Sequence, residues 1–128
     1  MTGSRARIVV ASLAAVLMVT ALTGVVNASP GRGTVTTISA VASTYSSPHW
    51  TPTRVKIDPG TRVEWLALNY DHVLVAYGDN WTFNHSLPEG ASVTKRFRRR
   101  GIFLFRCTIH STLVNGVCQG MCGKVVVH

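Results

Sequence analysis

Residues 101–110 read Gly-Ile-Phe-Leu-Phe-Arg-Cys-Thr-Ile-His, and this stretch decides the fold. Phe103, Phe105 and Cys107 occupy every second position, so a β-strand turns all three side chains to one face, toward a core. His110 follows three residues after Cys107. The stretch therefore predicts a strand that ends on a buried thiol, with an imidazole close behind it in the chain.

The same two-residue alternation recurs in short runs on both sides of this stretch, and no run has the 3.6-residue period of a long helix. Turn signals separate the runs; in Asp58-Pro59-Gly60, proline presets its own φ and glycine accepts the positive φ that follows. The pattern predicts an all-β chain folded as a Greek-key β-sandwich or barrel of about seven to eight strands. The other runs are Val55 to Ile57, Val63 to Trp65, Val73 to Tyr77, Val93 to Phe97 and Val125 to Val127.

The first 28 residues have the features of a secretory signal peptide. Arg5 and Arg7 precede an uncharged run from Ile8 to Val26, and Val26-Asn27-Ala28 offers small residues where a signal peptidase cuts. The run is also just long enough to remain as a membrane anchor through residues 8–26. Both interpretations place the domain outside the cytoplasm. We expect residues 29–51 to form a lead-in and first strand, and residues 52–128 to form the remainder of a single domain.

The chain of 128 residues is strongly basic, with 13 Lys and Arg against 5 Asp and Glu. This balance suggests an acidic or anionic partner, but no helix-turn-helix or zinc-finger spacing supports nucleic acid. The densest basic run contains Lys95, Arg96, Arg98, Arg99 and Arg100. It is either a solvated strand edge or a docking patch for an acidic protein or an anionic membrane surface. Six strand steps, about 20 Å, separate it from Cys107, so we expect it at the opposite end of the domain.

Three cysteines is an odd number for an exported chain. Cys118 and Cys122 flank Gly120 and could close a small disulfide ring if the loop geometry allows, which would leave Cys107 unpaired. Alternatively, Cys107 is a structural thiol or pairs with one of the other two. A thiolate and an imidazole at this spacing suit a soft or borderline metal, and two His, one Cys and a weak axial Met are the blue-copper pattern.

Four segments of the chain resemble the cupredoxins, in particular the plastocyanin-like and azurin-like small copper proteins. Gly101 to His110 is similar to the family's Gly-x-Tyr-x-Tyr-x-Cys-x-x-His run, with Phe at both Tyr positions, and Gly120 to Val127 resembles its Met-x-Gly-x-Val ending. Val55 to Trp65 resembles the family's strand-turn-strand, and Asn69 to His72 resembles the segment that carries the first histidine ligand. The resemblance covers roughly residues 52–127.

The resemblance implies a mononuclear type 1 copper site with His72, Cys107, His110 and Met121 as ligands. This chain departs from the family in the length of residues 111–120, which separate His110 from Met121; a Cys118–Cys122 disulfide would bring this long loop back to the metal. Gln119 or a backbone oxygen is the alternative to Met121, and His85 is the alternative to His72. We expect the remaining two histidines, His49 and His128, on the surface.

The function implied is one-electron transfer to a redox partner protein. Non-redox copper storage, delivery or resistance would use nearly the same ligands, and an adhesion-type sandwich would need no metal. An enzyme is not expected, because the five histidines include no His-x-His pair for a second copper centre, and the chain has neither a nucleophile elbow nor a phosphate-binding loop.

Overall fold

The computed structural model describes residues 34–42 and 47–128, so the predicted signal segment lies outside the described residues. Within this part of the chain the structure contains nine β-strands and no helix. It follows that none of the described residues belongs to a helix that could cross a membrane.

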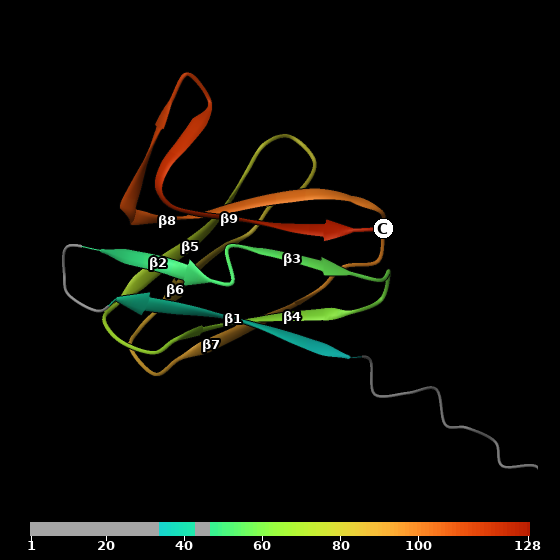
Figure 1. The fold of residues 1–128 in the computed structure, drawn as a ribbon, viewed down its shortest axis with the longest axis horizontal. Coiled ribbons are helices and arrows are strands. Elements are labelled where there is room, and N and C mark those ends of the chain that lie inside the picture. The colour runs from blue at the N-terminus through green and yellow to red at the C-terminus, as the bar shows by residue number, and fades with distance from the viewer. Residues whose placement is uncertain (1–33, 43–46) are drawn as a thin grey trace, which may run out of the picture.

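The strands form two sheets that face each other (Figure 1), and the predicted all-β sandwich is confirmed. Nine strands exceed the predicted seven or eight, because two four-residue strands carry little pattern: β2 begins at Pro48, and β6 is mostly polar and exposed. The first sheet has the order β2 (Pro48–Thr51), β1 (Val35–Ala42), β4 (Arg62–Ala67), β7 (Ser92–Arg96). The second has the order β3 (Arg54–Ile57), β9 (Val117–Val127), β8 (Gly101–Val114), β5 (His72–Tyr77), β6 (Asn84–Leu87).

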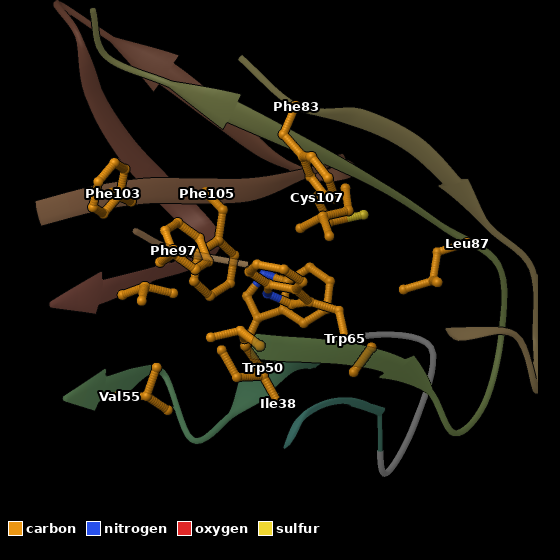
Figure 2. Packing of buried hydrophobic residues seen from close by; sticks show 14 of the residues in the cluster. Ile38, Trp50, Val55, Trp65, Phe83, Leu87, Phe97, Phe103, Phe105 and Cys107 are labelled. Atoms are coloured by element: carbon orange, nitrogen blue, oxygen red, sulfur yellow. The ribbon is translucent and has the colours of Figure 1, made fainter. Parts of the chain in front are cut away.

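An aromatic core fills the space between the sheets (Figure 2). Trp50, Trp65 and Phe105 are at most 1% exposed, and Phe105 meets both indoles edge-on at centroid distances of 5.5 and 5.3 Å. Burying a side chain as large as Phe105 stabilises the fold by about 1.5–3 kcal/mol. Because Phe105 lies two residues before Cys107 on β8, the core fixes the position of the thiol.

The strand registers divide the molecule into two poles. At one pole, called here the basic pole, Val35 pairs with Arg62 and Arg62 with Arg96 in the first sheet. In the second sheet Val127 pairs with both Ile57 and Gly101 at this pole, and hydrogen bonds of Gly60 and Thr61 with Phe97 extend the β4–β7 pairing of the first sheet there. The other pole, called here the site pole, holds the ends of β1 and β4, the start of β5 and the far part of β8.

A long hairpin projects from the site pole, visible at the upper left of Figure 1. Residues 111–120, expected as a loop, are paired from Ser111 opposite Gly120 to Val114 opposite Val117. The turn consists of Asn115 and Gly116, whose φ angles are 50° and 78°. Asn-Gly with two positive φ angles is the sequence of a type I′ turn, which matches the twist of the two strands it joins.

Candidate metal centre

Three of the predicted ligands lie together at the site pole. The ligand atoms of His72, Cys107 and His110 all lie within 4.8 Å of one another. The Cys107 Sγ is 3.6 Å from His72 Nδ1 and 3.5 Å from His110 Nδ1. In the part of the chain that the structure describes, no other group of three or more His, Cys, Asp or Glu side chains is gathered in this way.

Cys107 is the free cysteine of the chain. Its side chain is fully buried, whereas Cys118 and Cys122 form a disulfide. The structure therefore excludes a disulfide between Cys107 and either of them. The backbone N–H of Val73 donates to the Cys107 Sγ at 3.5 Å, a contact that helps to hold the sulfur in place.

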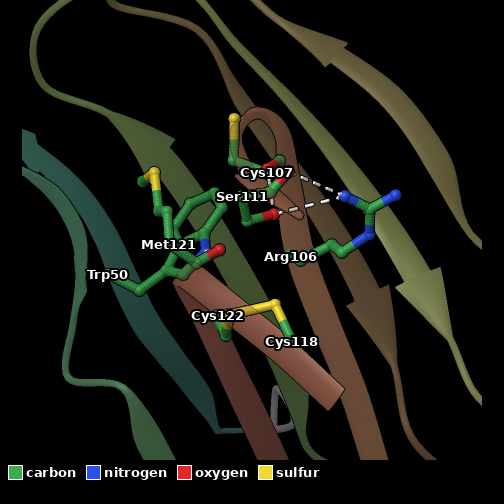
Figure 3. The surroundings of a disulfide bond; sticks show 7 residues. All are labelled: Trp50, Arg106, Cys107, Ser111, Cys118, Met121 and Cys122. Carbon is green, nitrogen blue, oxygen red and sulfur yellow. Dashed lines mark hydrogen bonds between the residues drawn. A yellow bond between two sulfur atoms is a disulfide. The ribbon is translucent and has the colours of Figure 1, made fainter. Parts of the chain in front are cut away.

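A break in the β8–β9 pairing brings His110 back toward Cys107. Pairing stops at Arg106 and resumes at Ser111, so residues 107–110 bulge from the ladder. Arg106 Nη1 donates to the carbonyl and the hydroxyl oxygen of Ser111 at 3.2 and 3.3 Å, and the Ser111 hydroxyl donates to the Cys107 carbonyl (Figure 3). These contacts close the bulge, and bulges of this kind re-aim side chains at functional sites.

The ring of His72 is held in the orientation a metal ligand needs. His72 is 1% exposed, and its Nε2–H donates to the backbone carbonyl of Asn69 at 3.1 Å. With the proton on Nε2, the lone pair of Nδ1 is directed at the Cys107 sulfur. An outer hydrogen bond of this type fixes both the tautomer and the ring plane of a metal-binding histidine.

Burial lowers the pKa of His72 below its ordinary value of 6.5, and a charge on the neighbouring His110 lowers it further. The hydrogen bond to Asn69 and the charge of Asp71 act in the opposite direction but are outweighed. His72 therefore stays neutral, the form that binds metals, at pH values where an exposed histidine would already be protonated.

Met121 is buried at the same pole. It is 1% exposed, its carbonyl accepts a hydrogen bond from Trp50 Nε1 at 3.2 Å, and its side chain extends in the same general direction as that of Cys107 (Figure 3). Gln119, its predicted alternative, is exposed. Gly120, just before Met121, has a φ of 99°, and a Cβ there would lie 2.5 Å from the His110 carbonyl oxygen. Only glycine allows this close approach.

The other three histidines lie outside the cluster. His85 is exposed on β6 and packs on the Phe83 ring at 4.4 Å. His49 is exposed, with its Nδ1 3.1 Å from the Ser47 carbonyl. His128 is exposed and lies 4.0 Å from Asp58. The structure thus places His72, not His85, beside the thiol.

The donor set fits a copper ion. Zinc–sulfur and zinc–nitrogen bonds of about 2.3 and 2.0 Å at a near-tetrahedral angle separate the two donors by about 3.5 Å, so the two sulfur–nitrogen distances in the cluster suit a first-row metal ion of this size. Two imidazoles, one buried thiol and the thioether of Met121, which is buried at the same pole, are the ligand types of a mononuclear blue-copper site.

Comparisons with known proteins identify the fold. No protein-family model and no curated protein sequence matches the chain. Among solved structures, a purple cupredoxin from Nitrosopumilus maritimus is similar with a TM-score of 0.56 and 20% identity, over 72% of this chain and 98% of that one. Pseudoazurin from Methylobacterium extorquens AM1 gives 0.57 and 18%, over 73% and 74%.

A copper-containing nitrite reductase from Thermus scotoductus SA-01 is also similar, with a TM-score of 0.56 and 20% identity over 72% of this chain. This chain spans only 22% of that enzyme. At such identities the likeness establishes the fold: the chain has the cupredoxin fold, as the resemblance of its four segments predicts.

Proposed function

We propose that this protein binds one copper ion through His72, Cys107 and His110, with Met121 as a weak fourth ligand, and carries one electron at a time. The observation that carries the proposal is the buried, unpaired Cys107 sulfur facing two imidazole Nδ1 atoms at 3.5 and 3.6 Å. A bound copper ion would supply the one-electron couple, and the surrounding residues would hold its ligands in place.

The protein is rigid where the ligands are attached. Rigidity favours electron transfer because the ligands rearrange less when the charge at the site changes. His72 is held by its hydrogen bond to Asn69, and its ring packs 5.9 Å from that of Trp50. Cys107 continues the strand whose Phe105 is locked in the aromatic core. Both ligands therefore keep their positions when the charge at the site changes.

His110 is the accessible side of the centre. His72 and Cys107 are at most 1% exposed, whereas His110 is half-buried. The neighbouring Ile109 is 55% exposed. A redox partner protein that docks on this side would meet the edge of the His110 imidazole, which gives electrons their shortest way into the site.

The location that we propose is outside the cytoplasm. The predicted signal segment, residues 1–28, supports it, and so does the disulfide between Cys118 and Cys122, because disulfides persist in oxidising compartments. We propose a carrier and not an enzyme, since the five histidines include no His-x-His pair for a further copper centre.

The test is the optical and EPR spectrum of the full chain loaded with Cu(II). We expect one copper ion per chain, an intense band near the red end of the visible range from sulfur-to-copper charge transfer, and a reversible potential. Cys107→Ser should abolish the band, and the control His85→Gln, which changes a histidine outside the cluster, should keep it.

If the protein is colourless and takes up only Cu(I), the result would favour copper storage or delivery over electron transfer. Failure of the wild-type chain to bind copper stoichiometrically, or equal spectra for Cys107→Ser and wild type, would overturn the metal centre altogether.

A further inference from the structure

A cluster of six cations occupies the basic pole. Arg62 and Arg96 are paired on neighbouring strands, and Arg98, Arg99 and Arg100 lie in the connection from β7 to β8, all exposed. Lys95 is half-buried, with its Nζ 5.7 Å from the centre of the Phe83 ring. The acidic groups nearby are Asp58, Asp79 and, two residues after Arg62 on β4, Glu64, so six cations against three acidic groups leave the pole with a positive excess.

Four of the six cations line a hollow of about 500 Å³. Its floor is aromatic, made by Trp81, Phe97 and Phe103, and no acidic residue lines it. Trp81 is fixed there by donating its indole N–H to the Leu104 carbonyl at 2.9 Å. Lys95, Arg96, Arg98 and Arg99, together with Asn80 and Thr82, make up the rest of the lining.

Such a hollow suits the head group of an anionic lipid. Arginine donates to phosphate oxygens in a forked geometry, and each basic side chain near an anionic membrane surface adds to binding. Tryptophan is enriched where protein meets the lipid head groups, because its ring is apolar and its N–H is polar. The basic pole has both features in one place.

The course of the chain points to the same partner. β1 begins at Val35, opposite Arg62, so the preceding residues join the domain at the basic pole. Those residues contain the uncharged run from Ile8 to Val26, preceded by Arg5 and Arg7. Figure 1 shows that β1 begins at the same end of the molecule as the C-terminus and that the β8–β9 hairpin lies at the other end.

We propose that the basic pole docks on an anionic membrane surface, with lipid phosphates in the hollow beside Trp81. The metal centre then faces away from the membrane, because six strand steps, about 20 Å, separate Gly101 from Cys107. Exposed Asp71 and Glu89 at the site pole strengthen this orientation, since an anionic surface repels them. The proposal is independent of copper and is tested on metal-free protein.

The experiment places the full chain in lipid nanodiscs and reads the orientation by NMR. Lipids with a paramagnetic head group broaden the amide signals of residues close to the bilayer. With 30% anionic lipid we expect strong broadening at Asn80, Trp81 and residues 98–101, and little at Asn115 and Gly116. With neutral lipid or in 0.5 M salt the broadening at the basic pole should fall at least threefold, because salt screens exposed charges.

Two double variants that lose the same charge distinguish binding by the basic pole from a general effect of net charge. Arg98→Gln/Arg99→Gln should reduce the broadening to the level in neutral lipid. Arg54→Gln/Lys124→Gln, which changes an exposed pair at the start of β3 and within β9, away from the basic pole, should leave it near the wild-type value.

Three results would overturn the proposal. Equal broadening in neutral and anionic discs would mean that the N-terminal segment alone holds the domain near the bilayer. Broadening centred on the hairpin would reverse the orientation. Broadening at the wild-type level in Arg98→Gln/Arg99→Gln would mean that the hollow does not hold the lipid phosphates.

Discussion

Asn69 binds both backbone polar groups of Ala42: the Ala42 N–H donates to Asn69 Oδ1 at 2.9 Å, and Asn69 Nδ2 donates to the Ala42 carbonyl at 2.6 Å. The two residues are 27 positions apart in the chain. Because the carbonyl of Asn69 also accepts the hydrogen bond of His72, one asparagine ties the end of β1 to the orientation of a proposed metal ligand.

Asn69→Ala should therefore weaken both the fold and the copper site. The part-buried N–H and carbonyl of Ala42 lose their partner, which costs about 1–3 kcal/mol, and the loop that aims His72 loosens. Denaturant unfolding and copper titration measure the two effects. The control Asn80→Ala removes one exposed hydrogen bond to Ile102 at the basic pole, should cost about 1 kcal/mol, and should leave copper affinity unchanged. Equal copper affinity in Asn69→Ala and wild type would contradict this role.

Gly120→Ala should displace the hairpin from the metal centre. The new Cβ would lie 2.5 Å from the His110 carbonyl oxygen and 3.2 Å from the Ser111 Cα, at a φ of 99°. The backbone conformation alone costs about 1–3 kcal/mol, and His110 must also shift. Gly116→Ala is the matched control, because its φ is 78° and its Cβ would meet open space. We expect a lower melting temperature in both variants but an altered Cu(II) EPR spectrum only in Gly120→Ala; identical spectra would show that the close approach does not position His110.

Removal of the disulfide should act on the hairpin and not on the core. In Cys118→Ser/Cys122→Ser the loss of a five-residue ring costs about 2 kcal/mol by its loop entropy. Amide hydrogen exchange should accelerate at residues 111–120, which pair only with each other, and stay slow at residues 102–106. A thiol assay should find one buried thiol, that of Cys107, in wild type and variant alike. Faster exchange throughout β8 would mean that the disulfide supports the whole sandwich.

The metal-free protein should lose stability as the pH falls below about 6.5, the ordinary pKa of histidine. Burial lowers the pKa of His72 in the folded state, so the unfolded chain binds more protons in this range and the free energy of unfolding decreases as the pH falls. Guanidinium unfolding at pH 7.5 and pH 5.5 measures the change, which His72→Gln should diminish and the exposed His85→Gln should not. A pH dependence that survives in His72→Gln would have to come from other groups.

The central strand and its thiol could be predicted because they follow a local rule. Two-residue alternation turns Phe103, Phe105 and Cys107 to one face, and the structure buries all three. The grouping of His72 with Cys107 and His110 could not be derived from periodicity; it came from the resemblance to cupredoxins. Contacts such as that between Asn69 and Ala42 join distant residues, and the amino-acid sequence carries no periodic signal for them.

The hairpin at residues 111–120 did have a local signal. Asn115-Gly116 between two valines is typical of a two-residue turn, but the unusual distance between His110 and Met121 made a loop the expected structure. The bulge at residues 107–110 had no comparable signal, because it is closed by the side chains of Arg106 and Ser111 reaching across the gap in the ladder.

Because residues 111–120 are paired as a hairpin, the length of this segment can change without changing the geometry of the candidate metal centre. Strand pairs add residues two at a time, one on each arm, so the arms can lengthen or shorten at the Asn115-Gly116 end while Ser111 and Gly120 stay opposite each other. The tip is thus a natural insertion point, where a peptide tag or a graft for a chosen redox protein can be added about 3.4 Å per residue pair farther from the proposed copper ligands.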